Sequence, residues 1–206
     1  MIITPPDAAS VSGRAAEMYA ADIADDGFVF AHTQAMAVNP EAYAAFEELV
    51  HAVVPSIGVR VYEAATLGAA RAIGSTHCLL AHARRALRAG VVDEAGIAAF
   101  AAHDDRGFGA AEQAVIRFAE RLSTSPRSMT DADSEALRAH GFSDRQIVDI
   151  ALAAAARNLF SRTLQSLAVP VDATPGLPPG IAAALIRLAG EADGTDSEHT
   201  EPGDAV

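Results

Sequence analysis

Apolar residues recur along this chain at spacings of three and four, and alanine is the commonest of them. A clear example is the run EAYAAFEELVHAVV (41–54), in which Tyr43, Phe46 and Val50 fall on one side of a helix. Alanine is the best helix former and lets helices pack closely. Tryptophan is absent, and glycine and proline fall mainly between the apolar stretches. This pattern predicts an all-α protein, and no stretch shows a convincing strand pattern.

The expected helices follow one another with short connections. Beyond 41–54 they are a first segment after Ser10 and the ranges 58–74, 76–90, 94–104, 110–123, 133–141 and 143–167. The connection between 58–74 and 76–90 is so short that these two helices should form an antiparallel hairpin. We expect one domain over residues 1–170. Residues 171–206 are then a linker, a candidate short helix at 181–190 and an acidic, disordered tail.

The charge of the chain limits its partners. The net charge is −12, and all fifteen basic residues are arginine. This balance argues against nucleic acid and against an anionic membrane as a partner. The longest apolar run, IVDIALAAAA (147–156), is interrupted by Asp149 and is too short to cross a bilayer. The first ten residues lack the basic and apolar regions of a signal peptide, so we expect a cytoplasmic protein.

The stretch GSTHCLLAH (74–82) holds the only cysteine of the chain, which excludes an intrachain disulfide and a cysteine-based zinc cluster. Cys78 and His82 lie four residues apart and share one helix face. Cys78 falls in the first turn, where free amides and the helix dipole favour a thiolate. Glu63 on the preceding helix can meet His82 across the hairpin and orient the imidazole. A lone cysteine in an alanine-rich helix is more often a small buried residue, so both interpretations stay open.

The segment from Glu63 to His82 resembles the signature of AhpD-like alkylhydroperoxidases within the carboxymuconolactone decarboxylase family. That signature is a Glu, eleven residues, and then Cys-x-x-Cys-x-x-x-His, sometimes with a His before the second Cys. Here Glu63 is followed by eleven residues and then by Ser75, where the family has its first cysteine. Cys78 and His82 occupy the positions of the second cysteine and the final histidine, with His77 before the cysteine. The resemblance extends more loosely over residues 10–170.

The resemblance implies an AhpD-like helical bundle built around the hairpin, assembled as a homo-oligomer, commonly a trimer or hexamer. It also implies a dithiol that reduces peroxides and is regenerated by an electron-donor protein. A hydroxyl at Ser75 cannot form a disulfide, so the two-cysteine cycle is unavailable. What remains is Cys78 with a proton relay through Glu63 and His82, which needs an external thiol or reductant protein. No organic cofactor and no metal is indicated.

Two positions of the motif keep alternative interpretations. Ser75 either donates a hydrogen bond to the thiolate or caps the helix, and we favour capping. His77 points about 200° away from His82 on ideal helical geometry. It can therefore lie at the pocket mouth, meet a neighbouring subunit, or have a surface or structural role.

For the arginines, the sequence predicts only the kind of partner that each is expected to have. Arg84, Arg85 and Arg88 form a basic edge that we expect to pair with surface carboxylates, within the chain or across a subunit boundary, with an anion site as the alternative. For Arg157 and Arg162 in the final helix we expect a buried ion pair, with a clamp for a substrate carboxylate as the alternative.

Three functions compete. The first is a single-cysteine peroxidase or thiol-dependent antioxidant enzyme of the AhpD-like type, acting through Cys78. The second is a lyase resembling carboxymuconolactone decarboxylase, in which Glu63 and His82 act on a small acid as acid and base and the cysteine is incidental. The third is a catalytically degenerate helical scaffold. The lack of a clear anion clamp weakens the second, and we rank the first above the third.

Overall fold

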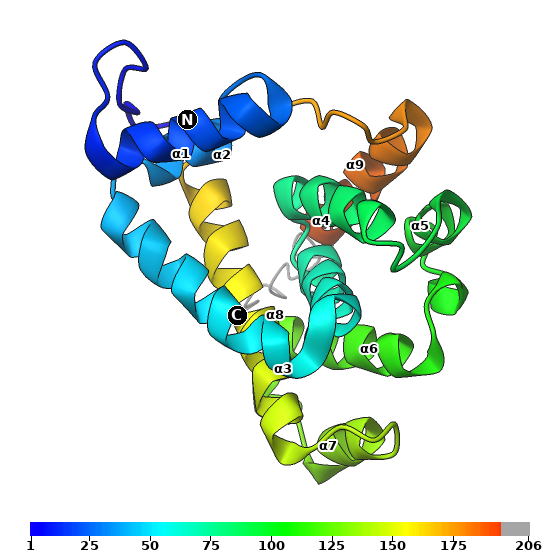
Figure 1. The fold of residues 1–206 in the computed structure, drawn as a ribbon. Helices are drawn as coiled ribbons and strands as arrows, with labels where there is room; N and C mark the ends of the chain where they lie inside the picture. The colour runs from blue at the N-terminus through cyan, green and yellow to red at the C-terminus, as the bar shows by residue number, and fades with distance from the viewer. Residues whose placement is uncertain (195–206) are drawn as a thin grey trace, which may run out of the picture.

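A computed structural model describes residues 1–194, and these residues form an all-α fold without strands (Figure 1). The fold class expected from the sequence is therefore confirmed. Within this range no helix is long and apolar enough to cross a membrane. The helices are α1 (Gly13–Asp26), α2 (Ala31–Met36), α3 (Pro40–Ala72), α4 (Thr76–Arg88), α5 (Glu94–Phe100), α6 (Ala110–Thr124), α7 (Asp131–Arg138), α8 (Asp144–Ser166) and α9 (Pro179–Gly194), with 3₁₀ turns at Asp105–Gly107 and Pro126–Ser128.

The long helix α3 is bent in its middle. The sequence predicted two helices, 41–54 and 58–74, and the structure joins them across a kink at Gly58, whose φ is 77° and ψ is 162°. Pro55 lies just before the kink and has no amide hydrogen to continue the helical ladder. Figure 1 shows the second half of α3 turning back toward α4. The bend matters because this second half carries Tyr62 and Glu63.

The hairpin of α3 and α4 is present as predicted, with only residues 73–75 between the helices. Gly74 adopts a left-handed φ of 63°. A Cβ atom added to Gly74 would also come within 2.7 Å of the carbonyl oxygen of Ala189 in α9. Both the turn and the close approach of α9 therefore require glycine there. The turn lets α4 begin at Thr76, which places Cys78 in its first turn.

The prediction that the Ser75 side chain caps α4 is wrong. Ser75 is the residue that precedes the helix, but its side chain makes no capping hydrogen bond. The side chain of Ser75 is instead buried, 1% exposed, at the tight turn between α3 and α4.

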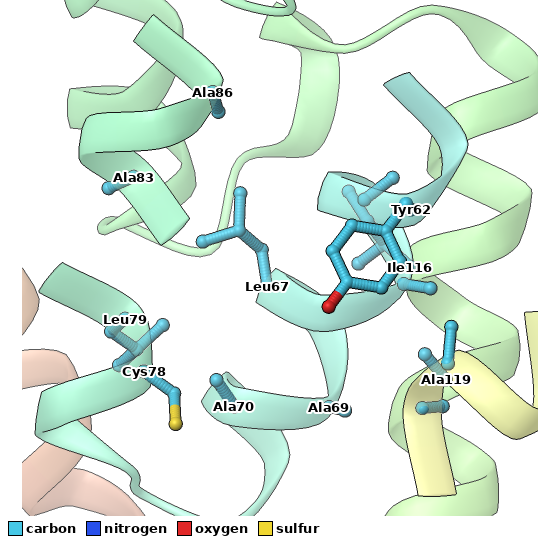
Figure 2. Close-up of a cluster of buried hydrophobic side chains, with 14 of the residues drawn as sticks. Tyr62, Leu67, Ala69, Ala70, Cys78, Leu79, Ala83, Ala86, Ile116 and Ala119 are labelled. Atoms are coloured by element: carbon cyan, nitrogen blue, oxygen red, sulfur yellow. The ribbon is translucent and has the colours of Figure 1, made fainter. Parts of the chain in front are cut away.

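Small residues let the central helices approach one another. Figure 2 shows Ala69, Ala70, Ala83 and Ala119 from α3, α4 and α6 around larger side chains such as Leu67. The alanine content read from the sequence thus serves close helix packing. Tyr62 and Cys78 belong to the same buried cluster (Figure 2), so the candidate site is continuous with the core.

Two segments differ from the sequence expectation in extent. The stretch that contains α2 showed no clear periodicity, yet residues 31–36 are helical. The candidate helix at 181–190 is present as α9, which is longer, and Leu185 and Leu188 are buried where it packs beside α4. Of the expected acidic tail, 191–194 form the end of α9, and 195–206 lie outside the described residues.

Candidate active site

The carboxylate of Glu63 and the imidazole of His82 face each other across the hairpin. His82 Nδ1 lies 2.7 Å from Glu63 Oε2, and both side chains are almost fully buried. A carboxylate can only accept, so Nδ1 donates the hydrogen and Nε2 keeps its lone pair. Burial and, secondarily, the charge of Arg157 lower the pKa of His82 to about 4. The imidazole is therefore neutral at pH 7, and the lowered pKa also makes it a weak base.

The sulfur of Cys78 has two hydrogen-bond partners among the described residues, and both come from α8. Ser161 Oγ donates to Sγ over 3.0 Å, and Arg157 Nη1 donates to it over 3.5 Å. All three side chains are buried, with Cys78 only 2% exposed. Donors to sulfur stabilise a thiolate more than a thiol, and the guanidinium adds a full positive charge. Neither His82 nor Glu63 hydrogen-bonds the sulfur directly.

Arg157 is a buried cation without a carboxylate partner in the described part of the chain. Besides Cys78, its guanidinium donates only to the hydroxyl of Tyr62, over 3.3 Å, and its Nε has no partner. The guanidinium also lies 5.4 Å from the ring centre of Phe160 and 6.0 Å from that of Phe46. Burial acts to lower the pKa of Arg157, but Cys78 and Tyr62 beside it raise the value above its ordinary one.

An unbalanced charge of this kind is costly to bury, so an anion is expected next to it. The expected buried ion pair of Arg157 is absent among the described residues. The thiolate of Cys78 and an anionic ligand are the two candidates for its counter-charge.

The sulfur of Cys78, the His82 imidazole and the Arg157 guanidinium lie on one cavity of about 200 Å³, here called the thiol cavity. Cys78, His82 and Arg157 contribute its chemistry. Aromatic side chains form much of its remaining wall: Tyr43, Phe46, Tyr62 and Phe160. Cys78 thus lies on a cavity, and Glu63 is within hydrogen-bond distance of His82.

The other motif positions are placed less centrally. His77 lines the thiol cavity, and its Nε2 donates to the carbonyl oxygen of Pro170 over 2.9 Å. It thus lies at the pocket, one of the alternatives that the helical geometry left open. Ser75 makes no hydrogen bond to the sulfur of Cys78, so the second suggested role of its hydroxyl is also absent.

Sequence reasoning missed Ser161 and Tyr62 and did not connect Arg157 with the thiol. The available signal was the spacing of Arg157 and Ser161, which lie four residues apart and share one face of α8. Nothing in the spacing indicated that this face would cover Cys78.

The basic edge of α4 is only partly paired. Arg84 forms the expected ion pair, with Asp26, although both side chains are largely buried rather than on the surface. Arg85 is 65% exposed and approaches Glu63 to 3.9 Å. Arg88 forms no salt bridge within the residues described. Over the same range no group of three or more His, Cys, Asp and Glu side chains is arranged to hold a metal ion.

The profile of the carboxymuconolactone decarboxylase family matches residues 40–121, which include the bent helix α3, the hairpin and α6. This match confirms the resemblance to that family seen in the sequence. A search of curated proteins finds no match.

Solved structures share the fold at low sequence identity. An AhpD-core, peroxidase-related protein from Ralstonia eutropha is 19% identical, with a TM-score of 0.73 over 90% of this chain and 96% of that one. The debrominase Bmp8 is 21% identical, with a TM-score of 0.70 over 89% and 97%. A peroxidase-related protein from Silicibacter sp. is 21% identical, with a TM-score of 0.67 over 85% and 94%. These similarities establish an AhpD-like fold and leave the reaction open.

Proposed function

We propose that this protein is a thiol-dependent peroxidase in which Cys78 is the peroxide-reactive group. The observation that carries the proposal is the environment of the sulfur, which receives hydrogen bonds from Ser161 and from the unpaired guanidinium of Arg157. Both contacts favour the thiolate, the nucleophilic form of cysteine. The family match and the AhpD-like fold are consistent with this chemistry.

In the proposed first step, His82 Nε2 accepts the proton of the Cys78 thiol, directly or through a water molecule. The thiolate then attacks one oxygen of the peroxide, the O–O bond breaks, and the sulfur becomes a sulfenic acid. The leaving alkoxide or hydroxide takes the proton back from His82. Glu63 holds the imidazole in the tautomer and orientation that this transfer requires, because it accepts the Nδ1 hydrogen.

The second half of the cycle requires two external thiols. One attacks the sulfenic acid and releases water, which leaves a mixed disulfide on Cys78. The other attacks the mixed disulfide, restores the thiol and leaves as part of a small disulfide. No internal thiol can do this, since Cys78 is the only cysteine. A single free cysteine suits a reducing compartment, so we place this cycle in the cytoplasm.

The test is turnover of hydrogen peroxide and an organic hydroperoxide with a small thiol as reductant. We expect catalytic peroxide consumption by the wild type and none above background by Cys78→Ser. A brominated pyrrole belongs in the same assay, because a cysteine variant of the similar debrominase was crystallised with 2,3,4-tribromopyrrole. Peroxide turnover that persists in Cys78→Ser would remove the proposal.

The second candidate function is the lyase, for which the structure offers a candidate anion clamp. The lyase hypothesis lacked an anion clamp, and Arg157 is a buried guanidinium on the thiol cavity with no carboxylate partner in the described chain. In this reading the acid group of a small lactone occupies Arg157, and His82 with Glu63 performs the proton transfers. The assay follows loss of an acidic lactone. Activity that survives in Cys78→Ser and disappears in His82→Ala would favour the lyase over the peroxidase.

We further propose that the protein is a homo-oligomer. Val148, Leu152 and Leu159 lie along one face of α8 and are 57%, 39% and 61% exposed. A row of exposed aliphatic side chains on a helix is a common contact surface between subunits. Light scattering of the wild type and of Leu159→Glu measures the mass, and we expect the variant to dissociate. A wild-type mass equal to that of the monomer would contradict the proposal.

A further inference from the structure

A second cavity adjoins the thiol cavity and has no role in the chemistry above. It also has a volume of about 200 Å³ and lies between α4, the region of α1 and α2, and the segment after α8. We call it the charged cavity, because ionisable side chains of both signs line it: Asp22, Asp172, Arg84, Arg85 and Arg88.

Most of these charges lack a close ionic partner within the described residues. Asp22 accepts the backbone amide hydrogen of Phe30 over 2.9 Å, and Asp172 accepts that of Ala31 over 2.7 Å. Neither aspartate forms a salt bridge. Arg88 forms none either, and Arg85 has only its 3.9 Å approach to Glu63.

Within the described residues, the wall charges without a salt bridge are thus two carboxylates and the guanidinium of Arg88, and Arg85 has only its long contact with Glu63. The remaining arginine, Arg84, is already paired with Asp26. Charges of both signs that are left unpaired around one small cavity fit a ligand that itself carries both signs.

The two cavities meet at a common wall. His32, His77, Ala81 and Arg85 line both of them. Arg85 is exposed, and its one ionic contact within the described residues is long, so it is the wall residue best able to turn toward a ligand. His32 stays neutral at pH 7 because burial lowers its pKa to about 4, so it adds no charge to the wall that the two cavities share.

We propose that the charged cavity binds the zwitterionic head of a small α-amino acid thiol, whose sulfhydryl group reaches Cys78 along the shared wall. The carboxylate of this thiol pairs with Arg85 and Arg88, and its ammonium group pairs with Asp22 and Asp172. The inference rests on the proposed function and names the class of the external reductant.

Burial of the sulfur supports a small reductant over a protein one. Cys78 is 2% exposed at the end of a cavity of about 200 Å³. A cysteine on the surface of a folded protein would have to enter this space together with part of its backbone. A free amino acid thiol needs only its own slim side chain there.

The binding test needs no peroxide. S-methylcysteine carries the same zwitterionic head without a reactive sulfhydryl group, and calorimetry should detect saturable binding with one site per chain. Loss of one charge-assisted contact is worth roughly tenfold in affinity or more. We therefore expect Arg88→Gln to weaken binding about tenfold and Arg106→Gln, an exposed arginine outside both cavities, to leave it unchanged. No binding at millimolar concentration, or equal binding by Arg88→Gln, would overturn the proposal.

The kinetic test measures how fast oxidised Cys78 is reduced. Protein treated with one equivalent of peroxide is mixed with L-cysteine or with uncharged 2-mercaptoethanol, each at the same thiolate concentration. We expect the rate with L-cysteine to saturate and to exceed that with 2-mercaptoethanol, and this preference to fall about tenfold in Arg88→Gln. Equal, non-saturating rates for both thiols, or faster reduction by a protein dithiol or a lipoyl arm, would contradict the inference.

The two tests separate the two proposals. If peroxide fails to oxidise Cys78, the proposed peroxidase is wrong, and calorimetry with S-methylcysteine still decides whether the charged cavity binds this head group. If Cys78 is oxidised but shows no preference for L-cysteine, the peroxidase stands and the assignment of the charged cavity falls.

Discussion

Replacement of Arg157 by methionine should slow the reaction of Cys78 without unfolding the protein. Arg157 Nη1 lies 3.5 Å from the sulfur of Cys78, and the side chain is 6% exposed. At an effective dielectric constant of about 20, opposite unit charges about 4 Å apart attract by about 4 kcal/mol. Only part of this attraction is present in the transition state of peroxide attack. We therefore expect sulfenylation of Cys78 to slow by about 10- to 100-fold in Arg157→Met.

The same substitution removes a buried charge that has no carboxylate partner. Replacing buried ions by apolar side chains of similar size is often neutral or stabilising by about 1–4 kcal/mol. The lost contacts with the rings of Phe46 and Phe160 offset part of this gain, each by about 1 kcal/mol. The free energy of unfolding should therefore stay within about 2 kcal/mol of the wild-type value, because the gain and the losses are of similar size.

Two assays on the same preparations check this prediction. Stopped-flow mixing with peroxide gives the sulfenylation rate, and urea titration gives the unfolding free energy. Arg162→Met is the matched control, since Arg162 is an exposed arginine on the same helix, and both quantities should stay at the wild-type value. A folded Arg157→Met protein that reacts with peroxide as fast as the wild type would refute the reasoning.

Three further predictions concern pH, the missing cysteine and packing. Burial lowers the pKa of His82 to about 4 from 6.5. Between about pH 4 and pH 6.5, His82 therefore binds a proton in the unfolded chain and not in the folded chain. As the pH falls from about 6.5 to about 4, His82 should cost on the order of 3 kcal/mol of stability, and urea titrations at both ends should show a smaller loss in His82→Gln. Ser75→Cys should let one equivalent of peroxide form a disulfide with Cys78, detected by mass spectrometry as a product that no longer reacts with thiol reagents. Gly68→Ala should cost about 1–3 kcal/mol of unfolding free energy, because its Cβ would lie 2.7 Å from a backbone oxygen of α6.

Each of these predictions has a control. In the pH series, burial also lowers the pKa of His32 to about 4, but His32 is present in both proteins, so its contribution to the loss of stability cancels. Equal losses of stability in the wild type and in His82→Gln would contradict the role given to His82. For the disulfide, Thr76→Cys presents a thiol off the motif spacing, and an unchanged thiol count in Ser75→Cys would count against the expected geometry. Gly180→Ala, where an added Cβ meets nothing within 4 Å, should stay near the wild-type stability.

Local sequence pattern was sufficient to predict the helical class, the hairpin and the meeting of Glu63 with His82. All three depend on residues that are close in sequence and held by one short turn at Gly74. The kink of α3 was not predicted, since the conformation of Gly58 within one continuous helix depends on how its two halves pack.

The surroundings of the sulfur could not be read from the sequence. Arg157 and Ser161 are about eighty residues from Cys78 and reach it only because α8 lies against the hairpin. Ser75 shows the opposite failure, because its residue type and position suggested a cap, whereas its side chain makes no capping hydrogen bond. Helical spacing predicts which residues share a face and leaves open what that face meets.

The central claim is that the buried sulfur of Cys78 is a working nucleophile, and single-turnover labelling tests it most directly. The purified, reduced protein is mixed with one equivalent of peroxide in the presence of a sulfenic acid trap, and the modified residue is located by mass spectrometry. We expect rapid, near-complete trapping at Cys78 and much slower trapping in Arg157→Met. A wild-type thiol that stays unmodified in excess peroxide at neutral pH would contradict it.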